Sequence, residues 1–215
     1  EETIKYFSRY AEKVVSCLGD NVKFWVVMNE PELFSFMSYW EGKWPPKKKN
    51  FISFYRVVVN LIKAHRKAYE VIKKIQPTSQ VGIATNNSYY EAYKNDPIAF
   101  VIKNLIESLD HFYFLDRIKN YQDFVGLNYY FHNRIKGFKF NQNENKKVSD
   151  LGWEICPEGI YYVLKNLKKY KKPIYITENG LADTQDKLRG DFIRDHLLWI
   201  HKAIGYGIDV KGYLH

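Results

Sequence analysis

The chain has 215 residues, of which 46% are hydrophobic and 17% aromatic, so it is long enough to bury the core of one large domain and lacks the composition of a disordered segment. Its net charge of +9 comes from 33 Lys and Arg against 24 Asp and Glu, but no nucleic-acid-binding motif accompanies the lysine clusters, so we expect a solvated surface and no nucleic-acid partner. No run of about 18 apolar residues occurs, and we expect no membrane partner.

The cysteines and histidines give no metal-binding pattern. Cys17 and Cys156 are the 2 cysteines, and their wide separation forms neither a metal-binding pair nor a disulfide framework. Among the 6 histidines, His196 and His201 are too far apart in sequence to share one helical face as a ligand pair. We therefore expect free thiols, no metal and no cofactor. We also expect a cytoplasmic protein, although the first residue is Glu1 rather than Met, which leaves a preceding signal peptide open.

The first part of the chain alternates between helical and strand patterns. Apolar residues recur at helical spacing over residues 4–18, and Gly19 is expected to end that helix. The almost wholly apolar residues 22–28 predict a buried parallel strand. A long amphipathic pattern then predicts a helix over residues 51–75, and residues 81–84 predict a second strand.

The middle of the chain continues the alternation. Pro97 is expected to open a helix, whose apolar face is supplied by residues 100–118. Residues 124–127 predict a third apolar strand, and the Asn-rich and Lys-rich residues 133–149 predict a polar loop. A further helix is expected over residues 157–170.

The last part of the chain adds two more strands. Residues 174–176 predict the fourth strand, an apolar helical pattern covers residues 192–200, and residues 210–214 predict the fifth strand. Repeated alternation of strand and helix predicts an α/β fold with a parallel sheet. Neither a dinucleotide-binding glycine motif nor a P-loop follows any strand, so a (β/α)8 TIM barrel is favoured over a doubly wound sheet.

Distinctive polar side chains follow four of the predicted strands where each one ends. They are Asn29 and Glu30, Asn86 and Asn87, Asn128 and Tyr130, and Glu178 and Asn179. In (β/α) barrels the chemistry is carried by the carboxyl ends of the strands. Glycoside hydrolysis needs one protonated and one ionised carboxyl group, and a separation of about 5 to 5.5 Å leads to retention of configuration. The sequence therefore favours Glu30 and Glu178 as a catalytic pair, over the alternative that each glutamate caps a loop or pairs with a lysine.

Three segments contain these positions: residues 25–31 (Trp-Val-Val-Met-Asn-Glu-Pro), 126–130 (Gly-Leu-Asn-Tyr-Tyr) and 175–180 (Tyr-Ile-Thr-Glu-Asn-Gly). Residues 150–159 and 212–215 fit the same pattern. Together the segments resemble glycoside hydrolase family 1, the β-glucosidase and β-galactosidase family, and most of all its archaeal-type β-glycosidases. The order and spacing of the segments make the resemblance specific, since Asn-Glu-Pro alone recurs in related barrel glycanases.

The resemblance implies a retaining double displacement in which Glu178 is the nucleophile and Glu30 is the acid/base. It further implies that Asn29 binds the sugar 2-hydroxyl, that Tyr130 orients Glu178, and that Asn128 supports substrate binding in the same segment. The implied partner is a small β-glycoside or oligosaccharide with a terminal glucosyl or galactosyl residue.

The resemblance also implies that residues 1–215 are a partial barrel domain that carries about strands four to eight and is truncated at both ends. A minimal barrel typically needs about 250 residues, and family members are about twice as long as this chain. Homo-oligomer formation is an option for the full-length protein. Whether residues 1–215 alone are active is not decided by the sequence.

Three other functions stay open at this point. An endo-glycanase of a related barrel family shares the Asn-Glu-Pro segment, and a 6-phospho-β-glycosidase would suit the basic charge. A noncatalytic carbohydrate-binding remnant would retain both glutamates without a complete sugar pocket. Hydrolysis of a chromogenic β-glucoside separates the enzyme from the remnant.

Overall fold

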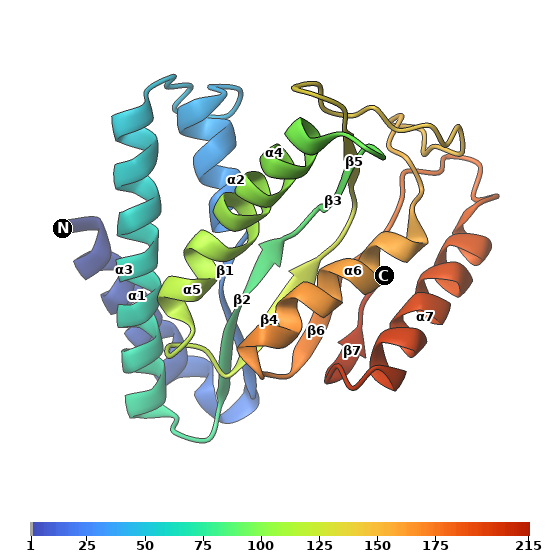
Figure 1. Ribbon diagram of the computed structural model, residues 1–215. Helices are drawn as coiled ribbons and strands as arrows, with labels where there is room; N and C mark the ends of the chain where they lie inside the picture. Colours follow the sequence, from blue (N-terminus) through green and yellow to red (C-terminus); the bar gives the residue numbers. More distant parts are fainter. Residues whose placement is uncertain (1) are drawn as a thin grey trace. The chain divides into compact units, whose positions relative to one another are not determined.

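The computed structural model describes residues 2–215, in which helices alternate with parallel strands (Figure 1). The chain divides into two compact units, one of Glu1–Asn86 with Tyr113–Gly126 and the other of Asn87–Phe112 with Leu127–His215. Strand β4 (Phe124–Asn128) passes from the first unit into the second. The two candidate carboxylates therefore belong to different units.

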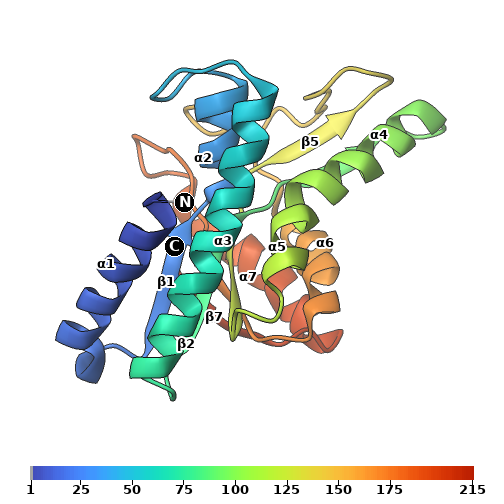
Figure 2. The ribbon, with the colours of Figure 1, turned by 90° about the vertical axis from the view of Figure 1, so that its left-hand side faces the viewer.

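The first unit contains a small parallel sheet in the order β1-β2-β4. Phe24 of β1 lies opposite Gln80 of β2, and Val26 lies opposite Gly82. Helices α1 and α3 lie side by side against these strands (Figure 2). The elements are α1 (Glu2–Leu18), a 3-10 turn (Gly19–Asn21), β1 (Phe24–Asn29), α2 (Pro31–Ser35), a π-helical turn (Phe36–Trp40), α3 (Phe51–Ile75), β2 (Gln80–Asn86) and α5 (Tyr113–Ile118).

The core of the first unit covers only one face of β1. A buried cluster joins α1, α3 and β2, and partly buried side chains of β1 pack against it: Val15, Ile72 and Val81 with Trp25 and Val27. Successive side chains of a strand point to opposite faces. Phe24 and Val26, on the other face of β1, are 48% and 46% exposed. The predicted burial of residues 22–28 is therefore wrong for one face of the strand.

The second unit contains strands in the order β4-β6-β7 and a separate parallel pair, β3 and β5. Ile174 of β6 pairs with Val210 of β7, and helices α6 and α7 pack against each other. The elements are β3 (Tyr89–Ala92), α4 (Pro97–Glu107), a π-helical turn (Ser108–Phe112), β5 (His132–Ile135), α6 (Pro157–Leu167), a 3-10 turn (Lys168–Tyr170), β6 (Ile174–Glu178), α7 (Arg189–Gly205) and β7 (Val210–Tyr213). The sequence prediction contained neither β3 nor β5, and it placed β5 at the start of a loop.

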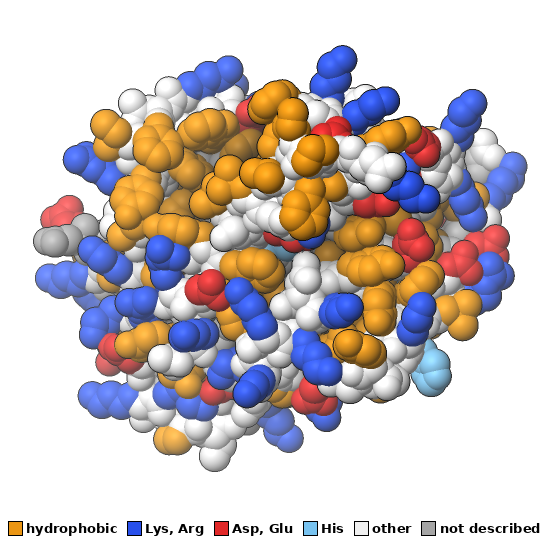
Figure 3. Space-filling view, in the orientation of Figure 1, with side chains coloured by type: hydrophobic (Ala, Val, Ile, Leu, Met, Phe, Trp, Pro, Cys, Tyr) orange, Lys and Arg blue, Asp and Glu red, His pale blue; other side chains and the backbone are white. Residues whose placement is uncertain are grey.

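Helix α4 begins as predicted, but its apolar face is only partly buried. The Asp96 side chain accepts a hydrogen bond from Ala99 N at 2.9 Å, and Pro97 occupies the first helical position. This bond, together with one from Gly137 N, lowers the pKa of the Asp96 carboxyl. Exposed apolar side chains gather on the face shown in Figure 3. The exposed apolar side chains of α4 are Ile98, Phe100, Val101 and Leu105.

Tyr129 is the largest fully buried side chain among the described residues, and its position requires a glycine at residue 159. Its hydroxyl donates to the Cys156 carbonyl oxygen at 2.7 Å, at the start of α6. A Cβ at Gly159 would lie only 2.0 Å from that hydroxyl oxygen. Glycine at this position therefore allows the first turn of α6 to approach the end of β4.

Three buried histidines make stability sensitive to acid. The His65 ring donates to Tyr121 O and the His196 ring to Phe192 O, both at 2.7 Å. Burial lowers the pKa of His65 and His196 to about 4, and that of His111 to about 3. A histidine in the unfolded chain has a pKa of about 6.5, so the unfolded state binds protons first as the pH falls. The stability that these neutral rings contribute is present above about pH 6.5 and is lost toward pH 4.

We therefore expect the free energy of unfolding, measured by denaturant titration, to fall between about pH 6.5 and pH 4. His196→Gln should reduce the slope in that range, because it removes one group that must charge. His201→Gln, at an exposed position of the same helix, is the matched control and should leave the slope unchanged. Equal slopes in the parent and His196→Gln would contradict this explanation.

Candidate active site

Glu30 follows the end of β1, directly before α2, in an uncommon backbone conformation. Its φ and ψ are 47° and 52°, the left-handed region that non-glycine residues rarely adopt. Glu30 N donates to Ala84 O at 2.8 Å, and Glu30 O accepts from Phe34 N at 2.9 Å, so the residue links β2 to the first turn of α2. The register of β1 against β2 shifts between Val26 and Asn29, as at a β-bulge. Such strain and bulges cluster at functional sites, where they aim a side chain.

One side chain of β2 reaches the Glu30 carboxyl group. Asn86 Nδ2 donates to Glu30 Oε1 at 2.9 Å. Asn29 lies beside Glu30 at the end of β1, pairs with Ala84, and is exposed, whereas Glu30 is half-buried. The first unit thus presents Asn29, Glu30 and Asn86 at the carboxyl ends of two adjacent parallel strands.

Glu178 ends β6 and is held by a tyrosine from the end of β4. Tyr130 Oη donates to Glu178 Oε2 at 2.9 Å. The main chains are linked as well, because Tyr129 N donates to Glu178 O at 3.0 Å. The Tyr130 ring also meets the Trp153 ring edge-on, with 6.2 Å between the ring centres. This is the arrangement that the family resemblance implies for a nucleophile and its orienting tyrosine.

Two buried asparagines, Asn128 and Asn179, make hydrogen bonds that join the strand ends near Glu178. Thr177 Oγ1 donates to Asn128 Oδ1 at 2.7 Å, which joins β6 to β4. Asn179 Nδ2 donates to Tyr129 O at 2.7 Å, and Asn179 Oδ1 accepts from Tyr213 Oη at 3.0 Å. Asn179 therefore bridges β4 and β7 next to Glu178. The sequence analysis predicted Asn128 as a site residue, but it assigned no role to Asn179 or Tyr213.

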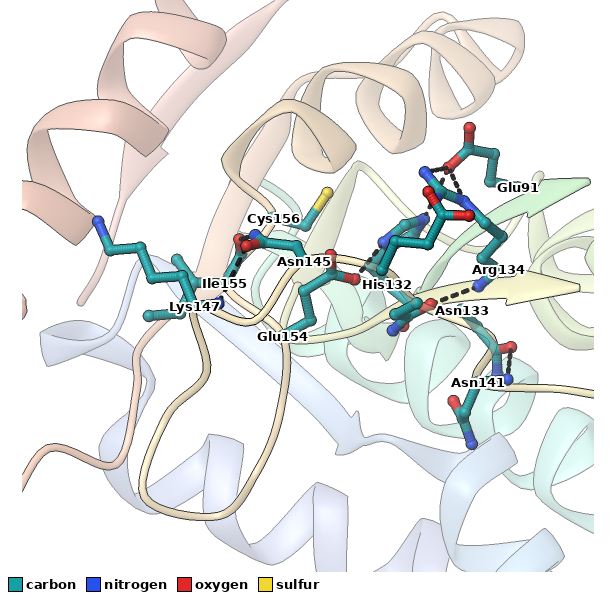
Figure 4. Close-up of polar contacts among 12 residues, drawn as sticks. Glu91, His132, Asn133, Arg134, Asn141, Asn145, Lys147, Glu154, Ile155 and Cys156 are labelled. Carbon is teal, nitrogen blue, oxygen red and sulfur yellow. Dashed lines mark hydrogen bonds and ion pairs between the residues drawn. The ribbon is translucent and has the colours of Figure 1, made fainter. Parts of the chain in front are cut away.

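The second unit also holds an ion network that the sequence did not predict (Figure 4). The His132 ring lies between two carboxylates, with Nδ1 at 2.6 Å from Glu154 Oε2 and Nε2 at 3.0 Å from Glu91 Oε2. Arg134 Nη2 is 2.9 Å from the same Glu91 oxygen. A cavity of about 630 Å³ adjoins the network, and Trp199 contributes to its lining. These contacts join Glu91 of β3, His132 and Arg134 of β5, and Glu154 in the segment before α6.

Residues 2–215 include no group of three or more His, Cys, Asp or Glu side chains that could hold a metal ion. No helix in the same range is long and apolar enough to cross a membrane.

The sequence model of glycosyl hydrolase family 1 matches residues 1–116 and 113–215. A chloroplastic galactolipid galactosyltransferase of Arabidopsis thaliana is 32% identical over 100% of this chain and 37% of its own length. Beta-glucosidase A of Thermotoga maritima is 30% identical over 99% of this chain and 58% of its own length. The solved beta-glycosidase from Pyrococcus horikoshii superposes with a TM-score of 0.90 at 32% identity, covering 99% of this chain and 55% of the other. The chain thus spans between about a third and three-fifths of the length of these relatives.

Proposed function

Because the chain belongs to glycosyl hydrolase family 1 and carries part of its (β/α)8 barrel, we propose that it forms part of a retaining β-glycosidase. The proposed substrate is a small glycoside with a terminal β-D-glucosyl or β-D-galactosyl residue, and two relatives are named beta-glucosidase A and beta-galactosidase. Residues 1–215 act as one portion of a longer barrel domain. The observation that carries the proposal is the 2.9 Å hydrogen bond from Tyr130 to Glu178, because it aims one carboxylate oxygen at the end of a barrel strand.

In the first step, an oxygen of Glu178 attacks the anomeric carbon while Glu30 protonates the leaving glycosidic oxygen. The bond from the anomeric carbon to the aglycone breaks, and a glycosyl-enzyme ester forms on Glu178. In the second step, Glu30 takes a proton from water, which attacks the same carbon and releases the sugar. Two inversions give net retention.

The remaining site residues support this chemistry. Asn29, exposed at the end of β1, is proposed to hydrogen-bond the sugar 2-hydroxyl. The side-chain oxygen of Asn128 accepts a hydrogen bond from the Thr177 hydroxyl. We propose that this bond holds the end of β6 and in this way supports the sugar subsite. Tyr130 holds one oxygen of Glu178 and leaves the carboxylate aligned for attack.

The test is hydrolysis of a chromogenic β-glucoside by the full-length protein, with the first-formed sugar followed by proton NMR. The proposal predicts β-glucose as the initial product. Initial α-glucose would show inversion and exclude the double displacement. Activity restricted to internal bonds of a polysaccharide would support an endo-glycanase, and activity restricted to the 6-phosphoglucoside would support a phospho-glycosidase.

A second candidate function is glycosyl transfer, since one relative is named a galactolipid galactosyltransferase. Transfer by the double displacement proposed here would start from the same glycosyl-enzyme intermediate as hydrolysis, with a sugar hydroxyl in place of water as the acceptor. The same NMR experiment, run with a β-galactoside and excess acceptor sugar, distinguishes free galactose from a new glycoside.

Location and assembly are part of the proposal. Both cysteines are unpaired, and free thiols favour a reducing compartment, so we place the protein in the cytoplasm. The full-length protein is proposed to be a homo-oligomer, and one solved relative, a mutant of a hyperthermophilic beta-glucosidase, forms a dodecameric structure in its crystal. Cell fractionation and light scattering test the two statements separately.

Tyr130→Phe should lower kcat for a chromogenic β-glucoside about 10- to 100-fold, because the nucleophile loses the donor that orients it. The ring, and with it the packing against Trp153, is retained. The midpoint of thermal unfolding should therefore change little. Unchanged kcat in Tyr130→Phe would refute the orienting role.

A further inference from the structure

We infer that Asn86 is a positioning residue for Glu30. Its hydrogen bond determines which carboxyl oxygen of Glu30 carries the transferred proton. The inference rests on the proposed function. Asn86 was expected at a strand end, but nothing in the sequence linked it to the acid/base. The evidence lies within the first unit.

The backbone of Glu30 is fixed relative to β2. Glu30 N donates to Ala84 O at 2.8 Å, two residues before Asn86. Side chains two apart on a strand point to the same face, so Asn86 extends on the same side of β2 as Ala84. The left-handed backbone of Glu30 then directs its side chain toward that strand end, where Asn86 Nδ2 reaches Oε1 at 2.9 Å.

The hydrogen bond makes the two oxygens of Glu30 different. The terminal torsion of a glutamate is broad and nearly twofold, so the two oxygens of an unrestrained carboxyl group exchange freely. An amide N–H can only donate to an oxygen lone pair, and Oε1 uses one for Asn86. The carbonyl oxygen of a protonated carboxyl group accepts hydrogen bonds better than its hydroxyl oxygen, so a donor on Oε1 favours the form of Glu30 that carries the proton on Oε2. A proton transferred in the transition state depends on this alignment.

An effect on proton delivery has a signature that a purely structural effect lacks. Aglycones that are poor leaving groups need protonation as they depart, whereas a 2,4-dinitrophenolate departs without it. Weakened acid catalysis therefore lowers kcat/KM for an alkyl β-glucoside and leaves the dinitrophenyl β-glucoside nearly unaffected. Damage to the fold lowers both to the same extent.

The experiment compares Asn86→Ala and Asn86→Asp with the parent in the full-length protein, with alkyl, nitrophenyl and dinitrophenyl β-glucosides as probes. General acid catalysis contributes about 100- to 10,000-fold, and we expect both variants to lose about 10- to 100-fold on the alkyl glucoside. On the dinitrophenyl glucoside we expect a loss below about threefold. Asn86→Asp keeps the shape of the side chain and removes the N–H, but it adds a carboxyl group beside Glu30. Asn86→Ala removes the N–H without adding charge, so the same selective loss in both variants assigns the effect to hydrogen-bond donation.

Asn50→Ala is the matched control. It removes an asparagine of the same unit whose side chain accepts from Ser53 N at 2.8 Å and caps α3. It should lower the thermal midpoint without changing the dependence on leaving group. An equal loss on all three glucosides in Asn86→Ala and Asn86→Asp would overturn the positioning role. A parent protein that hydrolyses none of the three would refute the proposed function instead.

Discussion

Glu178→Gln should lower kcat/KM for a nitrophenyl β-glucoside at least about 10,000-fold, the scale of loss seen when a catalytic nucleophile is removed. The amide is isosteric with the carboxylate and can keep a hydrogen bond with Tyr130, so the structure around it should persist. It cannot form the glycosyl ester, and without the ester the two-step path is closed. Steady-state kinetics with the full-length protein measures the loss.

Two further variants make this result specific. Glu178→Gly with added azide should recover activity and release the α-glycosyl azide, because the small anion attacks directly from the side that the carboxylate occupied. Glu70→Gln, the same change at an exposed position of α3 paired with Lys67, is the matched control and should retain parent activity. Ordinary hydrolysis by Glu178→Gln would remove Glu178 from the mechanism.

His132→Ala should destabilise the protein by about 3 kcal/mol, because removing one partner leaves a buried charge uncompensated. The Glu154 side chain, which the ring contacts at 2.6 Å, is only 7% exposed. Glu91 would keep its contact with Arg134, so Glu154 carries most of the cost. A fall in the midpoint of thermal unfolding measures the effect.

The control for His132 is a surface ion pair. Lys67→Ala removes the 2.7 Å contact between Lys67 and Glu70, two well-exposed side chains. It should leave the midpoint of thermal unfolding nearly unchanged. Equal shifts for the two variants would show that the His132 network contributes no more than a surface pair does. A shift in His132→Ala that disappears when Glu154 is also changed to Gln would attribute the cost to the unpaired carboxylate.

Long periodic elements were predictable, and short non-local ones were not. Helix α3 has the predicted bounds, Phe51–Ile75, because its apolar pattern runs over many turns and Asn50 caps its start. Strands β3 and β5 have four residues each and form a two-stranded sheet with one another within the described residues, so their stability depends on contacts more than 40 residues apart. Local sequence carries no signal for such pairing.

Burial was the less predictable property. The apolar residues 22–28 predict a strand correctly, but a sequence does not say that helices cover only one of its faces. The same holds for α4, where Phe100, Val101 and Leu105 remain exposed. Periodicity identifies the apolar face of an element, and the element packed against it decides how much of that face is buried.

The site was partly predictable from the sequence. Strand ends and their carboxylates identify Glu30 and Glu178 as candidates, and the hydrogen bond from Tyr130 to Glu178 is present as the family resemblance implies. The sequence could not separate Asn86 from Asn87, since both follow the same apolar run. In the structure Asn87 is fully buried and Asn86 reaches Glu30. That distinction depends on the register and end of β2, which local pattern does not determine.

The most direct test of the central claim is to trap the intermediate. The full-length protein is incubated with 2,4-dinitrophenyl 2-deoxy-2-fluoro-β-glucoside, digested, and examined by mass spectrometry. A fluoroglycosyl group on the peptide with Glu178, at that residue, is the predicted result. A label on a different carboxylate, or catalytic turnover of β-glucosides with no label and an inverted product, would contradict the assignment of Glu178 as the nucleophile of a retaining β-glycosidase.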